Sequence, residues 1–204
     1  MELESFPALS QPGVRHAFST RSSVPLDRLE AELIESFSRA GFALDCSAQA
    51  EQTHGNQVAS VSEPSAARVP GVDALATGVA GLTLIVRVAD CGPVYFFDPV
   101  RRVIALAHSG RKGTEGNIVG RTIAHLGAAF GSRPGDLIVQ LGPCIRPPHY
   151  EIDFAAEIAR QARAAGVAHF HDGGTCTAAN LDRYYSYRAE KGKTGRMWAA
   201  LMLE

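Results

Sequence analysis

Three apolar runs follow one another between residues 81 and 108, separated only by short breaks. The first is rich in Leu, Ile and Val, and the second contains the aromatic stretch Tyr95–Phe97. Runs of this length and composition predict buried β-strands, at about residues 81–89, 93–98 and 102–108. The breaks are too short to hold another element, so this part of the chain commits the fold to a β-sheet.

The segments on either side predict further strands alternating irregularly with helices. Apolar side chains at Leu29, Leu33, Ile34 and Phe37 form one helical stripe that Gly41 ends. The other expected elements are strands at 14–20, 56–61, 136–142 and 196–203 and helices at 114–130 and 154–165, with 62–71 a surface loop and 181–192 helical or irregular. This order favours a single α/β domain (α+β-like) over residues 1–204, with a mixed central β-sheet flanked by helices.

Charge and composition narrow the class of function. The formal net charge of the 204-residue chain is -1, which predicts neither a nucleic-acid partner nor binding to an anionic membrane, so any anion site must be local. No basic leader precedes an apolar stretch, and we expect a cytoplasmic protein. The four cysteines lie far apart and a domain of this size needs no disulfides, so metal binding, catalysis or burial are their expected roles. Nothing in the sequence specifies an oligomeric state.

Three stretches place a metal-binding residue type where a loop meets an apolar strand: "QTHGNQV" with His54, "ADCGPV" with Cys91 and "ALAHSG" with His108. Two imidazoles and one thiolate suit zinc, and three protein ligands leave a fourth position for water or substrate. Taken singly, Cys91 also fits a small buried apolar side chain, and each histidine fits a hydrogen-bonded loop residue. The three must converge through the fold to form a site.

Other polar residues near these stretches are candidates for substrate contacts. Arg111 and Lys112 lie in the Gly-rich "HSGRKG" before an expected helix, where phosphate is attracted, and Arg21 in "FSTR" is a second candidate site for an anion contact. Solvated basic turns are the alternative for both. Asp73 and Asp90 are candidate acid/base groups or groups that orient a metal ligand, with turn capping as the alternative.

A segment rich in Tyr, Arg and Gly precedes the last strand. Tyr185 and Tyr187 within it suit stacking against a planar ring, while a solvated aromatic loop is the alternative.

Taken together, these stretches resemble a known family, the laccase-domain or polyphenol-oxidase-like proteins. They are regarded largely as multifunctional purine nucleoside phosphorylases, with one branch described as a peptidoglycan editing factor. The matching motifs, in the family's order, are "FSTR", "QTHGNQV", "VDALAT", "ADCGPVYFFDP", "ALAHSG", "LGPCIRPPHYEI", "CT", "YYSYR" and "TGR".

The resemblance implies an α/β fold with zinc at His54, Cys91 and His108, phosphorolysis of adenosine, inosine and methylthioadenosine, adenosine deamination, and copper-dependent phenol oxidation in some members. Our leading hypothesis is a zinc-assisted enzyme with nucleoside and phosphate as partners. In it Arg21 and Lys112 hold phosphate or ribose, Tyr185 or Tyr187 stacks the base, and Cys91 and Asp90 are catalytic. Arg111 and Lys112 stand where the family usually has Trp and Arg, and Lys lacks the bidentate fork of Arg. A metal-free hydrolase with Cys91 as nucleophile and His108 as base, or a non-catalytic binding protein, are the other interpretations.

Overall fold

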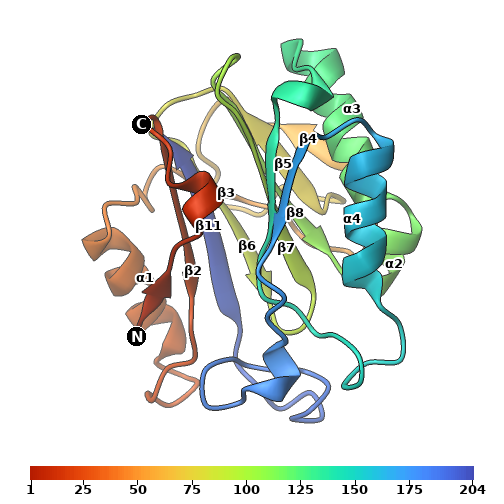
Figure 1. Ribbon diagram of the computed structural model, residues 1–204. Coiled ribbons are helices and arrows are strands. Elements are labelled where there is room, and N and C mark those ends of the chain that lie inside the picture. Colours follow the sequence, from red (N-terminus) through yellow and green to blue (C-terminus); the bar gives the residue numbers. More distant parts are fainter.

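The computed structural model describes residues 1–204 and has four layers, helix, sheet, sheet and helices (Figure 1). One helix covers the outer face of the first sheet, and three cover the outer face of the second. The helices are α1 (Leu29–Arg39), α2 (Arg111–Glu115), α3 (Ile118–Phe130) and α4 (Phe154–Ala164), with short 3-10 turns at Pro7–Leu9, Pro134–Asp136 and Thr177–Ala179.

Both sheets are mixed, which confirms the predicted α/β class. The five-stranded sheet has the order β1-β2-β11-β6-β3, and the six-stranded sheet has the order β10-β9-β7-β8-β5-β4. The strands are β1 (Leu3–Glu4), β2 (Val14–Ser19), β3 (Ser47–Gln49), β4 (Val58–Ser60), β5 (Ala74–Thr77), β6 (Thr83–Val88), β7 (Gly92–Asp98), β8 (Val103–Ser109), β9 (Ile138–Leu141), β10 (His169–Asp172) and β11 (Met197–Leu203). The strands thus form two stacked sheets, where the sequence predicted one central sheet.

The alternation of side chains along β7 explains why this strand is apolar at every position. Tyr95 and Phe97 belong to the core that contains the first sheet, whereas Val94 and Phe96 belong to the core beneath α3 and α4. Successive side chains of a strand point to opposite faces, so a strand between two apolar layers needs apolar residues on both. The antiparallel register of β7 with β8, in which Tyr95 faces Leu106, continues the same division.

Three local expectations need correction or refinement. The helix expected from Thr114 is two helices, because Asn117 adopts a left-handed φ of 58° and its side chain caps α3 by accepting a hydrogen bond from the Gly120 amide. Ile34 was expected on the buried stripe of α1, but it is exposed, because Ser36 lies on the buried face. The segment 181–192 contains no helix.

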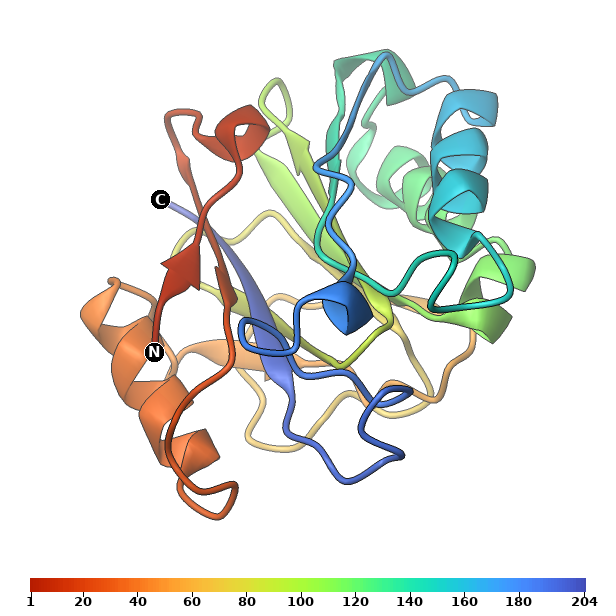
Figure 2. The ribbon, with the colours of Figure 1, turned by 60° about the horizontal axis from the view of Figure 1, so that its bottom comes forward.

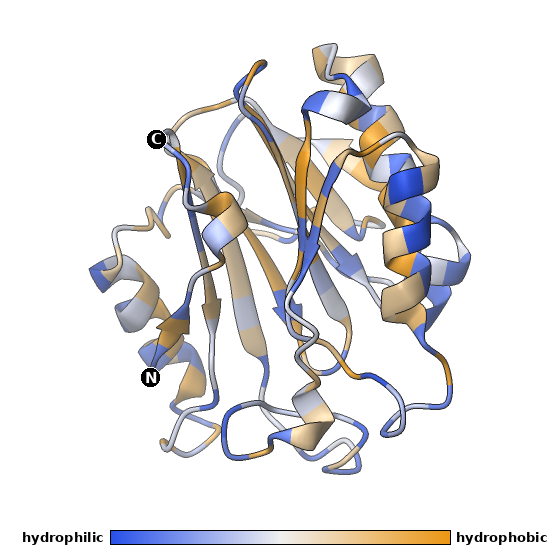
Figure 3. Ribbon diagram, viewed as in Figure 1, coloured by the Kyte–Doolittle hydropathy of each residue, from blue (hydrophilic) through white to orange (hydrophobic).

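Hydrophilic loops gather at one end of the molecule. Figure 3 shows the apolar strands meeting largely polar loops at its lower end. In Figure 2 the segment before β11 runs across this end. No helix of the chain is long and apolar enough to cross a membrane.

His16 in β2 makes folding sensitive to acid. The Phe6 amide donates a hydrogen bond to His16 Nε2 at 2.7 Å, so this nitrogen must be unprotonated. Burial lowers the pKa of His16 from 6.5 to about 4. Between pH 6.5 and 4 the unfolded chain therefore binds a proton that the folded chain does not, and the free energy of unfolding decreases as the pH falls.

The free energy of unfolding of the wild type should decrease between pH 7 and pH 5. We expect this decrease to be about 1 kcal/mol smaller in H16Q, a figure discounted for the partial exposure of the ring. Denaturant unfolding at both pH values measures this difference. The variant H149Q, at an exposed histidine, should keep the wild-type loss. An unchanged pH dependence in H16Q would contradict the assignment.

Candidate metal centre and cavity

The three residues predicted to bind metal converge in the structure. The ligand atoms of His54, Cys91 and His108 all lie within 4.8 Å of one another. His54 comes from the loop between β3 and β4, Cys91 from the connection between β6 and β7, and His108 from the end of β8. The convergence expected from the sequence is therefore present in the structure.

The break at Asp90–Cys91 lies where the chain passes from one sheet to the other. Strand β6 belongs to the first sheet and β7 to the second, and Asp90 between them has a φ of 85°. Strand β7 then pairs with β8 so that Pro93 faces His108. The crossing thus brings Cys91 beside His108 at the end of both sheets.

The buried carboxylate of Asp73 holds both histidines. It accepts hydrogen bonds from the backbone amides of His54 (2.9 Å) and Gly55 (2.7 Å) and from the Thr53 hydroxyl (2.9 Å). Its Oδ1 also lies 2.8 Å from His108 Nδ1. Because that contact occupies Nδ1, the other ring nitrogen of His108 is left for the cluster. Asp73 is therefore the orienting carboxylate, one of the two candidates from the sequence.

The cluster also couples the charges of Cys91 and His108. Burial opposes the thiolate, but hydrogen bonds from His108 and His54 outweigh it and lower the pKa of Cys91 from 9.0 to about 6. Burial likewise opposes the imidazolium, but the bonds to Asp73 and Cys91 raise the pKa of His108 to about 9. A thiolate is the form of cysteine that binds metals and acts as a nucleophile.

The donor set fits a metal ion. Tetrahedral zinc with bonds of about 2.0–2.3 Å separates its ligand atoms by about 3.3–3.8 Å. The ligand atoms lie within 4.8 Å of one another, so the cluster needs to contract by about 1.5 Å at most. The carboxylate behind His108 is an arrangement common to metal-bound histidines. His54 is exposed and Cys91 is half-buried, which leaves the cluster open to the solvent.

The side chain of Asp90 is hydrogen-bonded to the C-terminal part of the chain. Its Oδ1 accepts a hydrogen bond from the Thr177 hydroxyl at 2.7 Å, and its Oδ2 accepts one from the Arg188 amide at 2.7 Å. These bonds fasten two C-terminal segments to the β6–β7 connection. Asp90 lines the cavity described next, but its side chain makes no hydrogen bond to a cluster residue.

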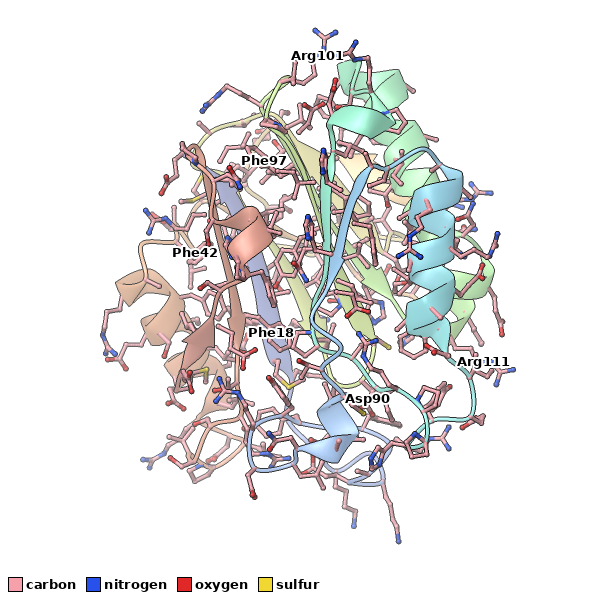
Figure 4. The ribbon with its side chains drawn as sticks, viewed as in Figure 1. Phe18, Phe42, Asp90, Phe97, Arg101 and Arg111 are labelled. Atoms are coloured by element: carbon pink, nitrogen blue, oxygen red, sulfur yellow. The ribbon has the colours of Figure 1, made fainter.

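The cluster lies in a cavity of about 980 Å³ at the loop-rich end of the molecule. Figure 4 labels two of the lining residues, Asp90 and Arg111, both toward this end. Five arginines and three aromatic side chains contribute to the wall: Arg68, Arg87, Arg111, Arg188, Arg196, Tyr150, Phe154 and Tyr187. A cavity of this size accommodates a small organic molecule together with an anion.

The predicted substrate-binding residues are distributed unevenly. Tyr187 lines the cavity, whereas Arg21, Lys112 and Tyr185 do not. Arg21 pairs with Glu190 at 2.7 Å and lies over the ring of Tyr185, and Tyr185 is itself buried. Lys112 is exposed outside the cavity, and its neighbour Arg111 lines the wall instead.

Sequence reasoning found Arg111 but missed the other four arginines of the cavity wall. Arg87 had a visible signal, because it is the one charged residue within the apolar run of β6, and Arg196 belongs to the "TGR" motif. Arg68 had none, since it lies in a Pro/Ser/Ala-rich loop that reads as surface.

Fold and cluster together define an α/β protein with a candidate Cys/His metal centre at the end of two stacked sheets. The chain belongs to the family described as multi-copper polyphenol oxidoreductase laccase, whose model matches residues 30–157 and 151–204.

Similarity to known proteins supports this assignment to the family. The chain is 33% identical to the "Purine nucleoside phosphorylase" of Deinococcus radiodurans, over 100% of this chain and 95% of that protein. It is 31% identical to "Purine nucleoside phosphorylase YlmD" of Geobacillus stearothermophilus, over 73% of this chain and 69% of the relative. The crystal structure of YlmD from Geobacillus stearothermophilus superposes with a TM-score of 0.87 at 24% identity, covering 98% and 94% of the two chains. That superposition shows the same fold.

A substitution at Gly110 tests how tightly the cluster is packed. A Cβ at this position would lie 2.7 Å from Cys91 Sγ and 3.5 Å from His54 Cδ2, although its φ of −91° suits any residue. We therefore expect G110A to displace the thiol and weaken metal binding about 10- to 100-fold, the range typical of perturbed ligand positions. Competition with a chelator measures the affinity.

The matched control is G135A, where an added Cβ meets nothing within 4 Å. It should bind metal as the wild type does. Unchanged affinity in G110A would show that the thiol position does not govern metal binding.

Proposed function

We propose that the chain is a zinc-dependent purine nucleoside phosphorylase. The observation that carries the proposal is that one cavity combines the His-Cys-His cluster with aromatic side chains and guanidinium groups. A purine offers a flat ring for the aromatic groups, and phosphate is an anion for the arginines. Two relatives of the chain are named purine nucleoside phosphorylases, which supports the same activity.

His54, Cys91 and His108 would hold the zinc ion. Zinc supplies a Lewis acid that stabilises negative charge developing on the substrate. Asp73 keeps the His108 ring in one orientation, and Asp90 keeps the segment with Arg188 against the cavity. Copper also suits one thiolate and two imidazoles, so the phenol oxidation known in the family would be a property of a copper-loaded form.

Phosphorolysis requires side chains that bind the purine and side chains that hold phosphate near the ribose. Tyr187 is half exposed in the wall and suits stacking on the purine. The arginines bring phosphate to the ribose, where a phosphate oxygen forms a bond to C1′ while the bond from C1′ to the purine nitrogen breaks. The products are ribose 1-phosphate and the free base.

The same site supports adenosine deamination as a second reaction. There, water replaces the 6-amino group of adenosine, which gives inosine and ammonia. The open position of a three-ligand metal site beside the cavity favours this reaction, because such a site activates water. Adenosine, inosine and methylthioadenosine are the substrates we propose.

Cys91→Ser tests the assignment. Wild-type protein should contain about one zinc per chain and release ribose 1-phosphate from adenosine only when phosphate is present. Without the thiolate, we expect C91S to retain less than about a tenth of the zinc and to lose at least about 100-fold in kcat/KM. Metal quantification and chromatography of the products measure both effects. C46S changes a cysteine outside the cavity and should behave as wild type.

Each competing interpretation gives a different result in the same assay. Inosine formed without phosphate shows deamination. Activity that survives in metal-free protein and is blocked by alkylation identifies Cys91 as the nucleophile of a hydrolase. Ligand binding without any product identifies a non-catalytic protein, and turnover of phenols alone by copper-loaded protein identifies an oxidase.

A further inference from the structure

The cavity wall carries more positive than negative charge. Its arginines are Arg68, Arg87, Arg111, Arg188 and Arg196, while Glu51 and Asp90 are its only carboxylates. Both carboxylates are engaged elsewhere, since Glu51 accepts a hydrogen bond from the Gly71 amide and Asp90 holds Thr177 and Arg188. The wall therefore has cationic groups that its own acids do not neutralise.

Two of the five arginines are paired outside the wall. Arg111 forms an ion pair with Glu115 at 2.9 Å, and Arg188 forms one with Glu151 at 3.0 Å. The other three have no carboxylate partner. Arg68 and Arg87 make no side-chain hydrogen bond within the chain, and Arg196 donates only to the carbonyls of Thr194 and Gly195. Each thus has guanidinium donors available for a ligand.

These three arginines come from adjacent segments at one end of the first sheet. Arg87 faces Trp198 in the register of β6 with β11, and Arg196 lies two residues before Trp198. Arg196 directly precedes β11, so Arg87 and Arg196 lie at the same end of two neighbouring strands. Arg68 precedes Val69, which bridges to Ala50 beside β3, the other neighbour of β6.

The backbone of Arg87 is held in place by the loop that carries His54. The Gln52 side chain accepts a hydrogen bond from the Arg87 amide at 2.9 Å and donates one to the Arg87 carbonyl at 2.6 Å. Gln52 lies two residues before His54, so the same loop positions Arg87 and a ligand of the cluster. Burial, and then the nearby charge of Arg68, lower the pKa of Arg87; the charge of Glu30 opposes this shift, and Arg196 adds to it. An anion would relieve this repulsion.

We propose that Arg68, Arg87 and Arg196 form a subsite for a phosphoryl group. Guanidinium groups bind phosphate through paired hydrogen bonds, and several together favour a dianion over a monoanion. Arg87 precedes Cys91 by four residues, so their Cα atoms lie at most about 14 Å apart. A ligand the size of a nucleotide spans that distance, so one molecule reaches both the subsite and the cluster.

The phosphoryl group has two possible sources. It is either inorganic phosphate, the co-substrate of phosphorolysis, or the phosphate ester of a nucleoside monophosphate. The first source rests on the proposed function, whereas the subsite itself does not, because equilibrium binding requires no turnover. Failure of the phosphorylase assay therefore leaves the binding test meaningful.

Calorimetric titration of the metal-loaded protein with inorganic phosphate, at constant chloride and without other oxyanions, tests the subsite. We expect R68Q, R87Q and R196Q each to weaken phosphate binding at least tenfold. Arg87 is half-buried, so R87Q could weaken binding by destabilising the fold. Arg68 is exposed, so R68Q tests the subsite without that risk. R101Q removes the same charge at the opposite end of the molecule (Figure 4) and should bind phosphate as wild type does.

A second titration with adenosine and adenosine 5′-monophosphate separates the two sources. If the subsite takes the ester, the monophosphate binds more tightly than adenosine, and that advantage disappears in the three variants. If it takes free phosphate, the monophosphate has no advantage, and the variants raise the KM for phosphate. Wild-type phosphate affinity in the three variants, equal loss in R101Q, or wild-type protein that binds neither phosphate nor the monophosphate overturns the proposal.

Discussion

The buried carboxylate of Asp73 is the group on which the candidate site depends. It joins the loop of His54 to the end of β8 through four contacts, three to residues 53–55 and one to the His108 ring. Its backbone carbonyl also accepts a hydrogen bond from the His108 amide at 2.7 Å. A charge buried this deeply is stable only when its lone pairs are satisfied, and these bonds hold its pKa below the ordinary value despite burial. Because one carboxylate binds both segments, it fixes the position of the His54 loop relative to the His108 ring.

The position of Cys91 follows from the layering of the fold. A strand that continued straight from β6 would stay in the first sheet, but the positive φ of Asp90 turns the chain into the second sheet at this point. Such a backbone conformation costs free energy in a residue other than glycine, and the hydrogen bonds of Asp90 to Thr177 and Arg188 offset that cost. The crossing, the thiol and the C-terminal wall of the cavity are therefore one structural unit. The strained residue, Asp90, thus directly precedes Cys91 of the metal cluster.

The sequence predicted seven of the eleven strands and the convergence of the three cluster residues, but not β1, β3, β5 and β10 or most of the wall around the cluster. Strands such as β7 were visible because burial on both faces leaves an uninterrupted apolar run. Asn117 was missed as a helix boundary because a left-handed conformation at one residue overrides a periodic pattern on both sides. Arg21 was expected in the site but pairs with Glu190, while Arg87 was ignored within a strand. Which cation remains unpaired depends on contacts between distant segments, and local pattern carries no information about them.

The charge of the cavity shows how a nearly neutral chain can hold an anion. The net charge of -1 gives the whole molecule no attraction for phosphate, and most arginines are neutralised by neighbours, as Arg160 is by Glu157. Pairing of that kind is worth little at the surface and leaves little field at a distance. Arg87 differs because it is half-buried, lacks a partner and adjoins two other guanidinium groups. In a partly desolvated cavity those charges interact more strongly than in water, so attraction for an anion is confined to one wall. The free protein keeps this unfavourable arrangement because Gln52, Trp198 and the sheet hold its backbone. Repulsion among these arginines destabilises the free protein, and a bound anion would relieve it and so gain affinity.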